Sequence, residues 1–280
     1  KISSKTKNKL MRKLVFLIAF FTSLFFTSCE EVVDVDLDTA PPKLVIEAAI
    51  NWEKGTSGKQ QVIKLSTTTG YFESQIPVVS NAIISIKNSK NQTFNFVEFN
   101  KSGRYISNDF IPQLNEQYTL TVISKGNTYT ATETLKSVAP ITRIEQKNDG
   151  GFTGKDTEIK AYFTDPGDED NFYLFKYVYS NKITSNYYVS EDKFYQGNEI
   201  FSSTVDEDLK TGDEVEITHY GISKQYYNYM NILVSIAGSN VGGPFQSPPA
   251  TVKGNIINTT DKNNYPLGYF SLSETSTKKY

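Results

Sequence analysis

The sequence contains only one cysteine and one histidine in 280 residues, Cys29 and His219. An intramolecular disulfide is therefore impossible, and the folded chain depends on the burial of apolar side chains for its stability. One histidine is too few for a histidine-based metal cluster. A Ser-His-Asp triad needs a suitable nucleophile, and no G-x-S-x-G pattern is present. We expect His219 to be an ordinary packed side chain.

Basic residues are not in excess, because 29 Lys and Arg stand against 31 Asp and Glu. Six of the basic residues and none of the acidic ones fall within residues 1–28. Without that stretch the net charge changes from −2 to −8. Binding to nucleic acid or to anionic lipid requires clustered Lys and Arg, so the composition predicts no nucleic-acid partner.

Long apolar runs are absent apart from residues 14–26, which follow Met11-Arg12-Lys13 and precede Thr27-Ser28-Cys29. As a helix this run would be about 20 Å long, too short for about 30 Å of hydrocarbon. A basic start, a short apolar run and small residues before a cysteine are typical of a bacterial lipoprotein signal peptide. We predict that residues 1–28 form this signal peptide, with residues 1–10 upstream of the true start, and that Cys29 carries a palmitate-containing lipid anchor.

Residues 29–42 are rich in acidic side chains and end in the pair Pro41-Pro42. One interpretation is an extended tether that holds the folded body away from the bilayer. The other is an edge strand, because Val33, Val35 and Leu37 alternate with aspartates. The sequence leaves both interpretations open.

Residues 43–138 alternate apolar and polar side chains with period two, and turn residues separate the runs. No helical stripe competes with this pattern. It predicts an antiparallel β-sandwich of immunoglobulin-like or transthyretin-like size, able to fold alone, with a domain boundary at Val138-Ala139-Pro140. The predicted strands are 44–50, 61–67, 82–87, 93–99, 103–107, 117–124 and 128–133.

The sequence pattern of residues 139–280 predicts a second β-rich domain with a helix at about 223–237. Ser223 can cap the start of this helix, and Gly238 suits its end. The expected apolar stripe consists of Tyr226, Met230, Leu233 and Ala237. The fold class is therefore mainly all-β, with two antiparallel β-sandwich-like domains. The predicted strands of the second domain are 141–146, 158–164, 172–180, 199–205, 214–220 and 268–273.

Tyrosine is concentrated in this second domain, where 11 of the 18 tyrosines fall between residues 162 and 229. Exposed tyrosine rings bind sugars or protein partners, because they combine a flat apolar face with a polar tip. The alternative is that these rings belong to the core of a sheet. Four aromatic residues in predicted loops or strand ends are candidate binding residues, namely Tyr187, Tyr188, Tyr195 and Phe245.

Acidic residues crowd one loop, where Asp165, Asp168, Glu169 and Asp170 could offer oxygen ligands to calcium. The ligand order of an EF-hand is absent, and Pro166-Gly167 suits an ordinary solvated turn, which we favour. Calcium is the only cofactor with any support in the sequence, and that support is slight.

Two other patterns resemble catalytic sites without completing them. Residues 150–156 imitate a phosphate-binding loop, but Asp156 stands where a Ser or Thr is required, so we expect a turn. Glycoside hydrolysis needs two carboxylates placed in space, and the sequence alone cannot show such a pair. The acids that could supply it are Glu191, Asp192, Asp206, Glu207 and Asp208, and we favour a solvated surface for them.

Four short motifs follow Cys29 in a fixed order: Leu44-Val45-Ile46-Glu47-Ala48, the loop 165–173, Gly254-Asn255-Ile256 and Leu267-Gly268-Tyr269-Phe270. Together they resemble the lipoprotein family catalogued as domain of unknown function 4249, over essentially the whole mature chain. The resemblance implies a Bacteroidota-type outer membrane and a TonB-dependent transporter as a neighbour. It supplies no catalytic residues.

These observations lead us to expect a lipid-anchored outer-membrane protein, surface-exposed or facing the periplasm, that acts by binding and not by catalysis. The resemblance implies an accessory to a TonB-dependent transporter that captures ligand or caps the pore. A structural or assembly scaffold of the envelope is the alternative. A carbohydrate- or peptide-acting enzyme is the third possibility.

Overall fold

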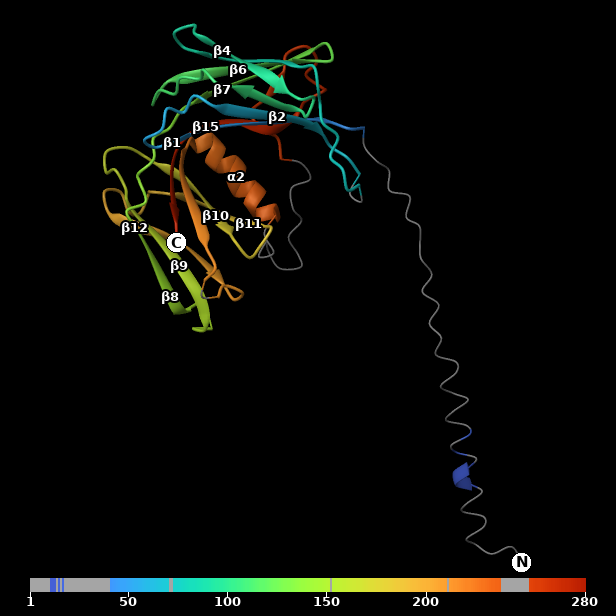
Figure 1. The fold of residues 1–280 in the computed structure, drawn as a ribbon, viewed down its shortest axis with the longest axis vertical. Helices are drawn as coiled ribbons and strands as arrows, with labels where there is room; N and C mark the ends of the chain where they lie inside the picture. Colours follow the sequence, from blue (N-terminus) through green and yellow to red (C-terminus); the bar gives the residue numbers. More distant parts are fainter. Residues whose placement is uncertain are drawn as a thin grey trace, which may run out of the picture. The chain divides into compact units, whose positions relative to one another are not determined.

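Short alternating strands dominate the computed structural model, as the period-two pattern predicts (Figure 1). The structure describes residues 11–13, 15, 17, 41–70, 73–151, 153–210, 212–237 and 252–280. Residues Pro41–Tyr280 form one unit, and Lys1–Ala40 form another. In the Lys1–Ala40 unit, the described residues 11–13, 15 and 17 are helical, whereas Cys29 and the predicted acidic tether lie outside the described residues. No helix in the described part of the chain is long and apolar enough to cross a membrane.

The first half of the Pro41–Tyr280 unit contains every strand that the sequence predicts for it, with shifted ends. Apolar side chains at alternate positions point into one core, and polar ones face outward. The strands are β1 (Leu44–Glu53), β2 (Gln61–Thr67), β3 (Ile83–Asn88), β4 (Thr93–Phe99), β5 (Arg104–Ser107), β6 (Gln117–Ser124) and β7 (Asn127–Thr134).

The second half contains the predicted strands and helix, and two strands that the sequence did not predict. The new strands are β11 (Ser185–Glu191) and the short β14 (Ile257–Asn258). The others are β8 (Arg143–Gly150), β9 (Asp156–Thr164), β10 (Phe172–Tyr179), β12 (Glu199–Asp206), β13 (Val215–Ile222), the helix α2 (Lys224–Ala237) and β15 (Leu267–Lys279). The phosphate-loop imitation at 150–156 falls at the turn between β8 and β9.

The strands form two sheets in the described part of the chain. The large sheet has the order β11-β10-β13-β15-β1-β2-β5-β4-β3-β6-β7-β14, and the small sheet has the order β12-β9-β8. Strand β4 pairs with β3 through Thr93–Phe96 and with β5 through Val97–Phe99, so the large sheet turns a corner there. This corner lets the first half enclose its own core.

Strand β15 connects the two halves, because it pairs in parallel with β1 and antiparallel with β13. Its residues Phe270 and Leu272, together with Ile256, pack into the core of the first half. The sequence assigns these three residues to the second domain. A cut at residue 138 therefore does not separate the two cores, because a late strand completes the early one.

The second half packs the small sheet against β10, β11 and β13. Strand β10 is covered on both faces: Tyr173, Phe175, Tyr177 and Tyr179 are buried between the sheets, whereas Leu174 is buried beneath α2. Figure 1 shows α2 lying along this face of the sheet. Most of the tyrosine-rich composition thus serves the core, which is the alternative that the sequence left open.

Helix α2 begins where its sequence predicts, because the Tyr226 amide donates to the Ser223 hydroxyl oxygen at 3.1 Å. Met230 is buried and Val234 packs beside it, whereas Leu233 is exposed. The expected stripe through Leu233 is therefore wrong by one position. The spacing from Tyr226 through Met230 to Val234 places the packed side chains four residues apart.

Residues 136–141, which connect the two halves, form hydrogen bonds with β13 and β15. Gly221 passes so close to it that an added Cβ would lie 1.8 Å from the Ser137 carbonyl oxygen, so only glycine fits. The relative placement of the two halves is therefore built from specific contacts within this unit. The polar contacts are Glu274 N to Lys136 O (2.8 Å), Val138 N to Glu274 Oε2 (3.0 Å), Ile141 N to Ser276 Oγ (3.1 Å) and His219 Nδ1 with Ala139 O (2.9 Å).

Candidate functional site

Strand β12 turns several polar side chains toward the interior of the sandwich and two apolar side chains toward solvent. Thr204 pairs with Ile159, a core residue, so Ser202, Thr204 and Asp206 face the interior of the sandwich. Phe201 and Val205 point outward and are 40% and 41% exposed. A strand that turns its polar side chains inward needs interior partners for them.

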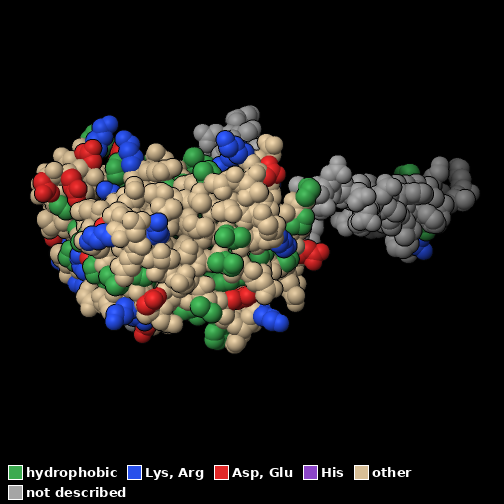
Figure 2. Space-filling view, turned by 90° about the horizontal axis from the view of Figure 1, so that it is seen from above, with side chains coloured by type: hydrophobic (Ala, Val, Ile, Leu, Met, Phe, Trp, Pro, Cys, Tyr) green, Lys and Arg blue, Asp and Glu red, His purple; other side chains and the backbone are tan. Residues whose placement is uncertain are grey.

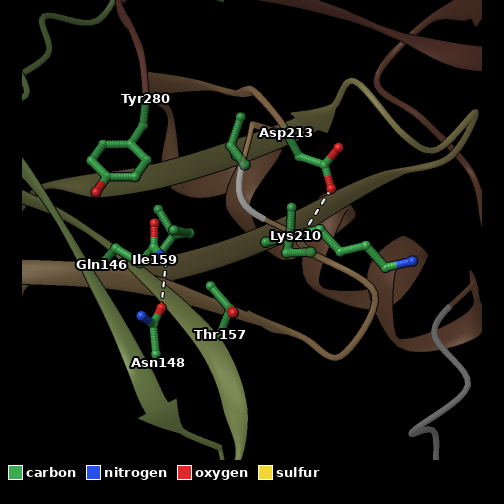
Figure 3. Close-up of a pocket in the computed structure, with 9 residues that line it drawn as sticks. Gln146, Asn148, Thr157, Ile159, Lys210, Asp213 and Tyr280 are labelled. Carbon is green, nitrogen blue, oxygen red and sulfur yellow. Dashed lines mark hydrogen bonds between the residues drawn. The ribbon is translucent and has the colours of Figure 1, made fainter.

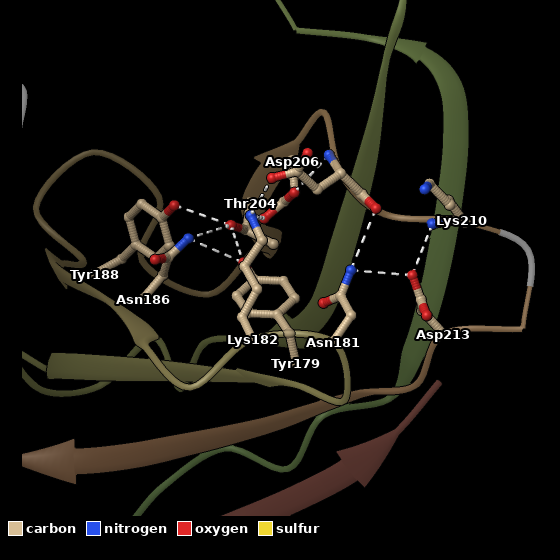
Figure 4. Close-up of polar contacts among 10 residues, drawn as sticks. Tyr179, Asn181, Lys182, Asn186, Tyr188, Thr204, Asp206, Lys210 and Asp213 are labelled. Carbon is tan, nitrogen blue, oxygen red and sulfur yellow. Dashed lines mark hydrogen bonds and ion pairs between the residues drawn. The ribbon is translucent and has the colours of Figure 1, made fainter.

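Those partners are hydroxyl and amide groups from β10 and β11 (Figure 4). The Tyr177 hydroxyl donates to Ser202 Oγ at 2.9 Å, and Thr204 Oγ1 lies 2.7 Å from the Tyr179 hydroxyl and 2.9 Å from the Tyr188 hydroxyl. Asn186 Nδ2 donates to the Tyr179 hydroxyl at 3.0 Å. Burial raises the pKa of Tyr179 to about 12, so its hydroxyl stays protonated at neutral pH.

A second set of contacts fixes the segment that follows β12. Lys182 Nζ donates to Asp206 Oδ2 at 2.6 Å and lies 3.2 Å from Asp208 Oδ2. The hydrogen bond to Asp206 raises the pKa of Lys182. Asn181 Nδ2 donates to the Asp208 carbonyl at 3.2 Å and to Asp213 Oδ2 at 3.1 Å (Figure 4). These contacts hold Asp206, Asp208 and Asp213 against the turn between β10 and β11.

At this end of the second sandwich the space between the sheets opens into a cleft of about 350 Å³, which we name the mouth cleft (Figure 3). Ile159 and Val215 end the apolar core there. The next interior position is polar, because Thr157 precedes Ile159 on the same face of β9. Gln146, which pairs with Ile159, is polar as well. The cleft is lined by Gln146, Asn148, Thr157, Ile159, Leu209, Lys210, Asp213, Val215 and Tyr280.

The walls of the mouth cleft combine hydrogen-bonding groups with an apolar base. Gln146 Nε2 donates to Asn148 Oδ1, so the two amides form one unit. In Figure 3 these amides, Thr157 and the Tyr280 ring lie on one side of the view, and Lys210 and Asp213 lie on the other. Amide side chains both donate and accept hydrogen bonds without changing charge. The cleft is therefore suited to holding a polar ligand.

Three of the four candidate binding residues lie in the described part of the chain, and none of them lines the mouth cleft. Tyr187 and Tyr188 lie on strand β11 and not in a loop, and each is 37% exposed. Tyr188 belongs to the interior network described above. Tyr195 is half-buried against the second core, and its hydroxyl donates to Ser190 Oγ at 3.2 Å. Phe245 lies outside the described residues.

The calcium candidates do not converge. Asp165 is buried and accepts hydrogen bonds from the Tyr173 hydroxyl (2.5 Å) and the Gly197 amide (3.2 Å). Burial raises its pKa. Asp168 is exposed, whereas Asp170 accepts from Gln196 at 3.2 Å. Among the described residues no three His, Cys, Asp or Glu side chains gather as metal ligands would.

Three of the other acidic candidates also have structural partners. Asp206 and Asp208 share Lys182, and Asp192 is buried and accepts from the Asn171 amide at 2.7 Å. His219 lies in the second core, where its ring stacks on Phe175 with centroids 4.1 Å apart. Sequence reasoning missed the mouth cleft. The sequence does contain one indication of it, because Ile144, Gln146 and Asn148 share one face of β8 and that face changes from apolar to polar.

Other surfaces of the molecule carry mixed side chains. On the face shown in Figure 2, positive and negative side chains are interspersed, and apolar ones are exposed singly or in small groups. In the first half the exposed Ile83 and Ile123 face each other across β3 and β6. These groups are less enclosed than the mouth cleft.

Three solved structures match parts of the chain at low sequence identity. A two-domain fibronectin type-III segment of chicken tenascin shares 12% identity over 64% of this chain and 90% of its own, with a TM-score of 0.22. The FN1–FN3 domains of chicken CNTN1 share 16% identity over 65% of this chain and 60% of theirs, with a TM-score of 0.26. A mutant of Salmonella alpha-2-macroglobulin shares 7% identity over 69% of this chain and 14% of its own, with a TM-score of 0.25.

No curated protein sequence matches the chain. A family model does match it, over residues 30–279, which is almost all of the sequence after Cys29. The motifs that carry the resemblance lie within this range, and two of them meet in space. Asn255 Nδ2 donates to the Phe270 carbonyl at 2.8 Å, and the Phe270 amide donates to Asn255 Oδ1 at 2.9 Å. The chain belongs to the family described as "Domain of unknown function (DUF4249)".

Proposed function

We propose that this protein is a lipid-anchored binding protein of the outer membrane, which captures a ligand in the mouth cleft for a TonB-dependent transporter. The observation that carries the proposal is the cleft itself, where the exposed amides of Gln146 and Asn148 and the half-buried Thr157 line the open end of the sandwich beyond its apolar core. Accessible amide and hydroxyl groups that converge on a cleft can form hydrogen bonds with a polar ligand.

The walls of the cleft favour binding over catalysis. Gln146 and Asn148 neither take up nor release a proton at neutral pH, and Thr157 lacks an adjacent histidine, since the only one lies in the core. The Lys182 contacts with Asp206 and Asp208 hold the opposite wall in place. A wall that is fixed before the ligand arrives lowers the entropic cost of binding.

The sequence supports the proposed location. Met11-Arg12-Lys13, a short apolar run and Cys29 are arranged as in a lipoprotein signal, and the family resemblance implies the transporter as a neighbour. One observation favours the scaffold alternative. The pairing of β15 with β1 and the fastened connection at residues 136–141 make the two halves one body, which suits a spacer.

The test is co-purification from native membranes after chemical cross-linking. We expect a TonB-dependent transporter, identified by mass spectrometry, to co-purify with the full-length tagged protein. Recovery should be reduced for Cys29→Ser, which removes the predicted anchor. If envelope assembly factors are recovered in its place, the scaffold function is correct and the proposed one is wrong.

A further inference from the structure

We infer that the mouth cleft binds a neutral glycan, taking one or two sugar rings. This inference rests on the proposed function, because it names the class of ligand that the cleft captures. Three properties of the cleft carry it: the hydrogen-bonding groups of its walls, the position of its charges and its apolar base.

The walls present donors and acceptors in the combination that sugar hydroxyls require. Gln146 and Asn148 are already joined through one amide donor and one amide oxygen, and each amide has further hydrogen-bonding capacity. Thr157 adds a hydroxyl group on the neighbouring strand. Adjacent hydroxyls of a sugar each donate and accept, so they match a pair of neighbouring amides better than a purely donating or purely accepting surface.

The charged groups near the cleft are either paired with other side chains or directed away from its amides. Asp213 Oδ2 accepts from the Lys210 amide at 2.9 Å and from Asn181 Nδ2 at 3.1 Å. Figure 3 shows the Lys210 ammonium extending away from Gln146, Asn148 and Tyr280. Lys182 is paired with Asp206. An ionic ligand would therefore be removed from water without a charge placed to meet it, which is unfavourable.

The base and size of the cleft fit a small ring. The Tyr280 ring, 47% exposed, and the half-buried Leu209 provide apolar surface, whereas Ile159 and Val215 are buried at the base of the cleft. A pyranose has an apolar C–H face that packs on such surfaces, and tyrosine combines this face with a polar tip. A volume of about 350 Å³ lies at the lower end of the range of about 300–1,000 Å³ for ligand pockets. This volume suits one or two sugar rings.

The experiment is isothermal titration of the full-length protein, solubilised in detergent, with four neutral probes: maltotriose, cellotriose, mannotriose and N-acetylchitotriose. Trialanine, a zwitterionic peptide, is titrated in parallel. The variants are Gln146→Ala and Asn148→Ala. Asn95→Ala is the matched control, because Asn95 is an exposed amide on β4 in the first half.

We expect at least one saccharide to bind, with affinity at least tenfold weaker in Gln146→Ala and Asn148→Ala and unchanged in Asn95→Ala. All three variants should keep the melting temperature of the wild type, since these amides are exposed. Two results would overturn the inference: no saccharide binds, or binding is unchanged in folded cleft variants.

The outcomes separate the inference from the proposed function. If trialanine alone binds, and its binding is lost in the cleft variants, the cleft captures ligand but the glycan class is wrong. If a saccharide binds in the cleft but no TonB-dependent transporter co-purifies with the protein, the glycan site stands. The transporter role is then wrong.

Discussion

His219 illustrates at the scale of one residue how burial determines chemistry. Its ring is fully buried among Phe163, Tyr173 and Phe175, and Nδ1 lies 2.9 Å from the Ala139 carbonyl oxygen. Among the described residues Nε2 has no hydrogen-bond partner. Burial lowers the pKa of His219 from 6.5 to about 3, because a buried imidazolium loses its hydration.

This lowered pKa predicts a specific acid sensitivity. Below pH 6.5 the unfolded chain binds a proton at His219 that the folded chain refuses until about pH 3. Stability from this group is therefore full above pH 6.5 and falls as the pH decreases, by about 1.4 kcal/mol per pH unit. Denaturant unfolding at pH 7 and pH 4.5 should show a loss of roughly 2–3 kcal/mol that His219→Phe lacks.

Phenylalanine keeps a ring in the same space and removes the titrating group. The control is Phe175→Leu, which disturbs the same stack but leaves the imidazole in place. That variant should be less stable at both pH values and keep the pH dependence of the wild type. Identical pH profiles for wild type and His219→Phe would show that His219 is not the source.

At the scale of elements, β15 determines how much of the chain is needed for folding. It pairs with β1 along Val45–Glu53, and it supplies Phe270 and Leu272 to the first core. The Asn255 side chain adds a backbone-like pair of hydrogen bonds to Phe270, which fixes the segment before β15. Gly254 is needed there, because an added Cβ would lie 1.7 Å from the Gly268 carbonyl oxygen.

The structure therefore predicts that residues 43–135 do not fold alone, contrary to the expectation from sequence. The fragment lacks three buried side chains of this core, Ile256, Phe270 and Leu272, and without β15 strand β1 has an unpaired edge. Each large side chain lost from a core costs about 2–5 kcal/mol, so the three together cost about as much as the whole stability of a typical domain, about 5–15 kcal/mol.

The measurement is the dispersion of the amide proton spectrum of the 43–135 fragment, with residues 41–280 as the control. The fragment should give the narrow dispersion of an unfolded chain and no cooperative thermal transition. A well-dispersed spectrum with such a transition would show that β15 is dispensable for the first core.

At the scale of the whole molecule, the proposed function requires the Pro41–Tyr280 unit to be held at a membrane by a chemical anchor. The predicted anchor is the lipid on Cys29. A single acyl chain binds membranes only marginally, so stable anchoring needs the several chains of a lipoprotein.

Replacing Cys29 by serine should move the protein from the membrane pellet to the soluble fraction, because serine cannot receive the lipid through a thioether. The measurement is fractionation followed by carbonate extraction and immunodetection. Cys29→Ser should also lack the mass of the lipid. A variant that stays in the carbonate-resistant pellet would refute the lipoprotein prediction.

The sequence by itself determined the type and approximate place of most elements. Period-two alternation between turn residues predicted strands such as Gln117–Ser124, and a capping serine with apolar residues at helical spacing predicted α2, because these signals act between near neighbours. The motifs around Gly254 and Leu267 likewise predicted the family that the comparison confirmed.

Only the tertiary structure decided the pairing of β15 with β1, the inward polar face of β12 and the mouth cleft. Each depends on residues far apart in the chain: Thr204 contacts Tyr179 and Tyr188, and Gln146 and Tyr280 line the same cleft. Strand β11 was missed because its sequence is polar and aromatic without clear alternation. Which face of a strand is buried depends on what packs against it, and that partner is not encoded in the strand itself.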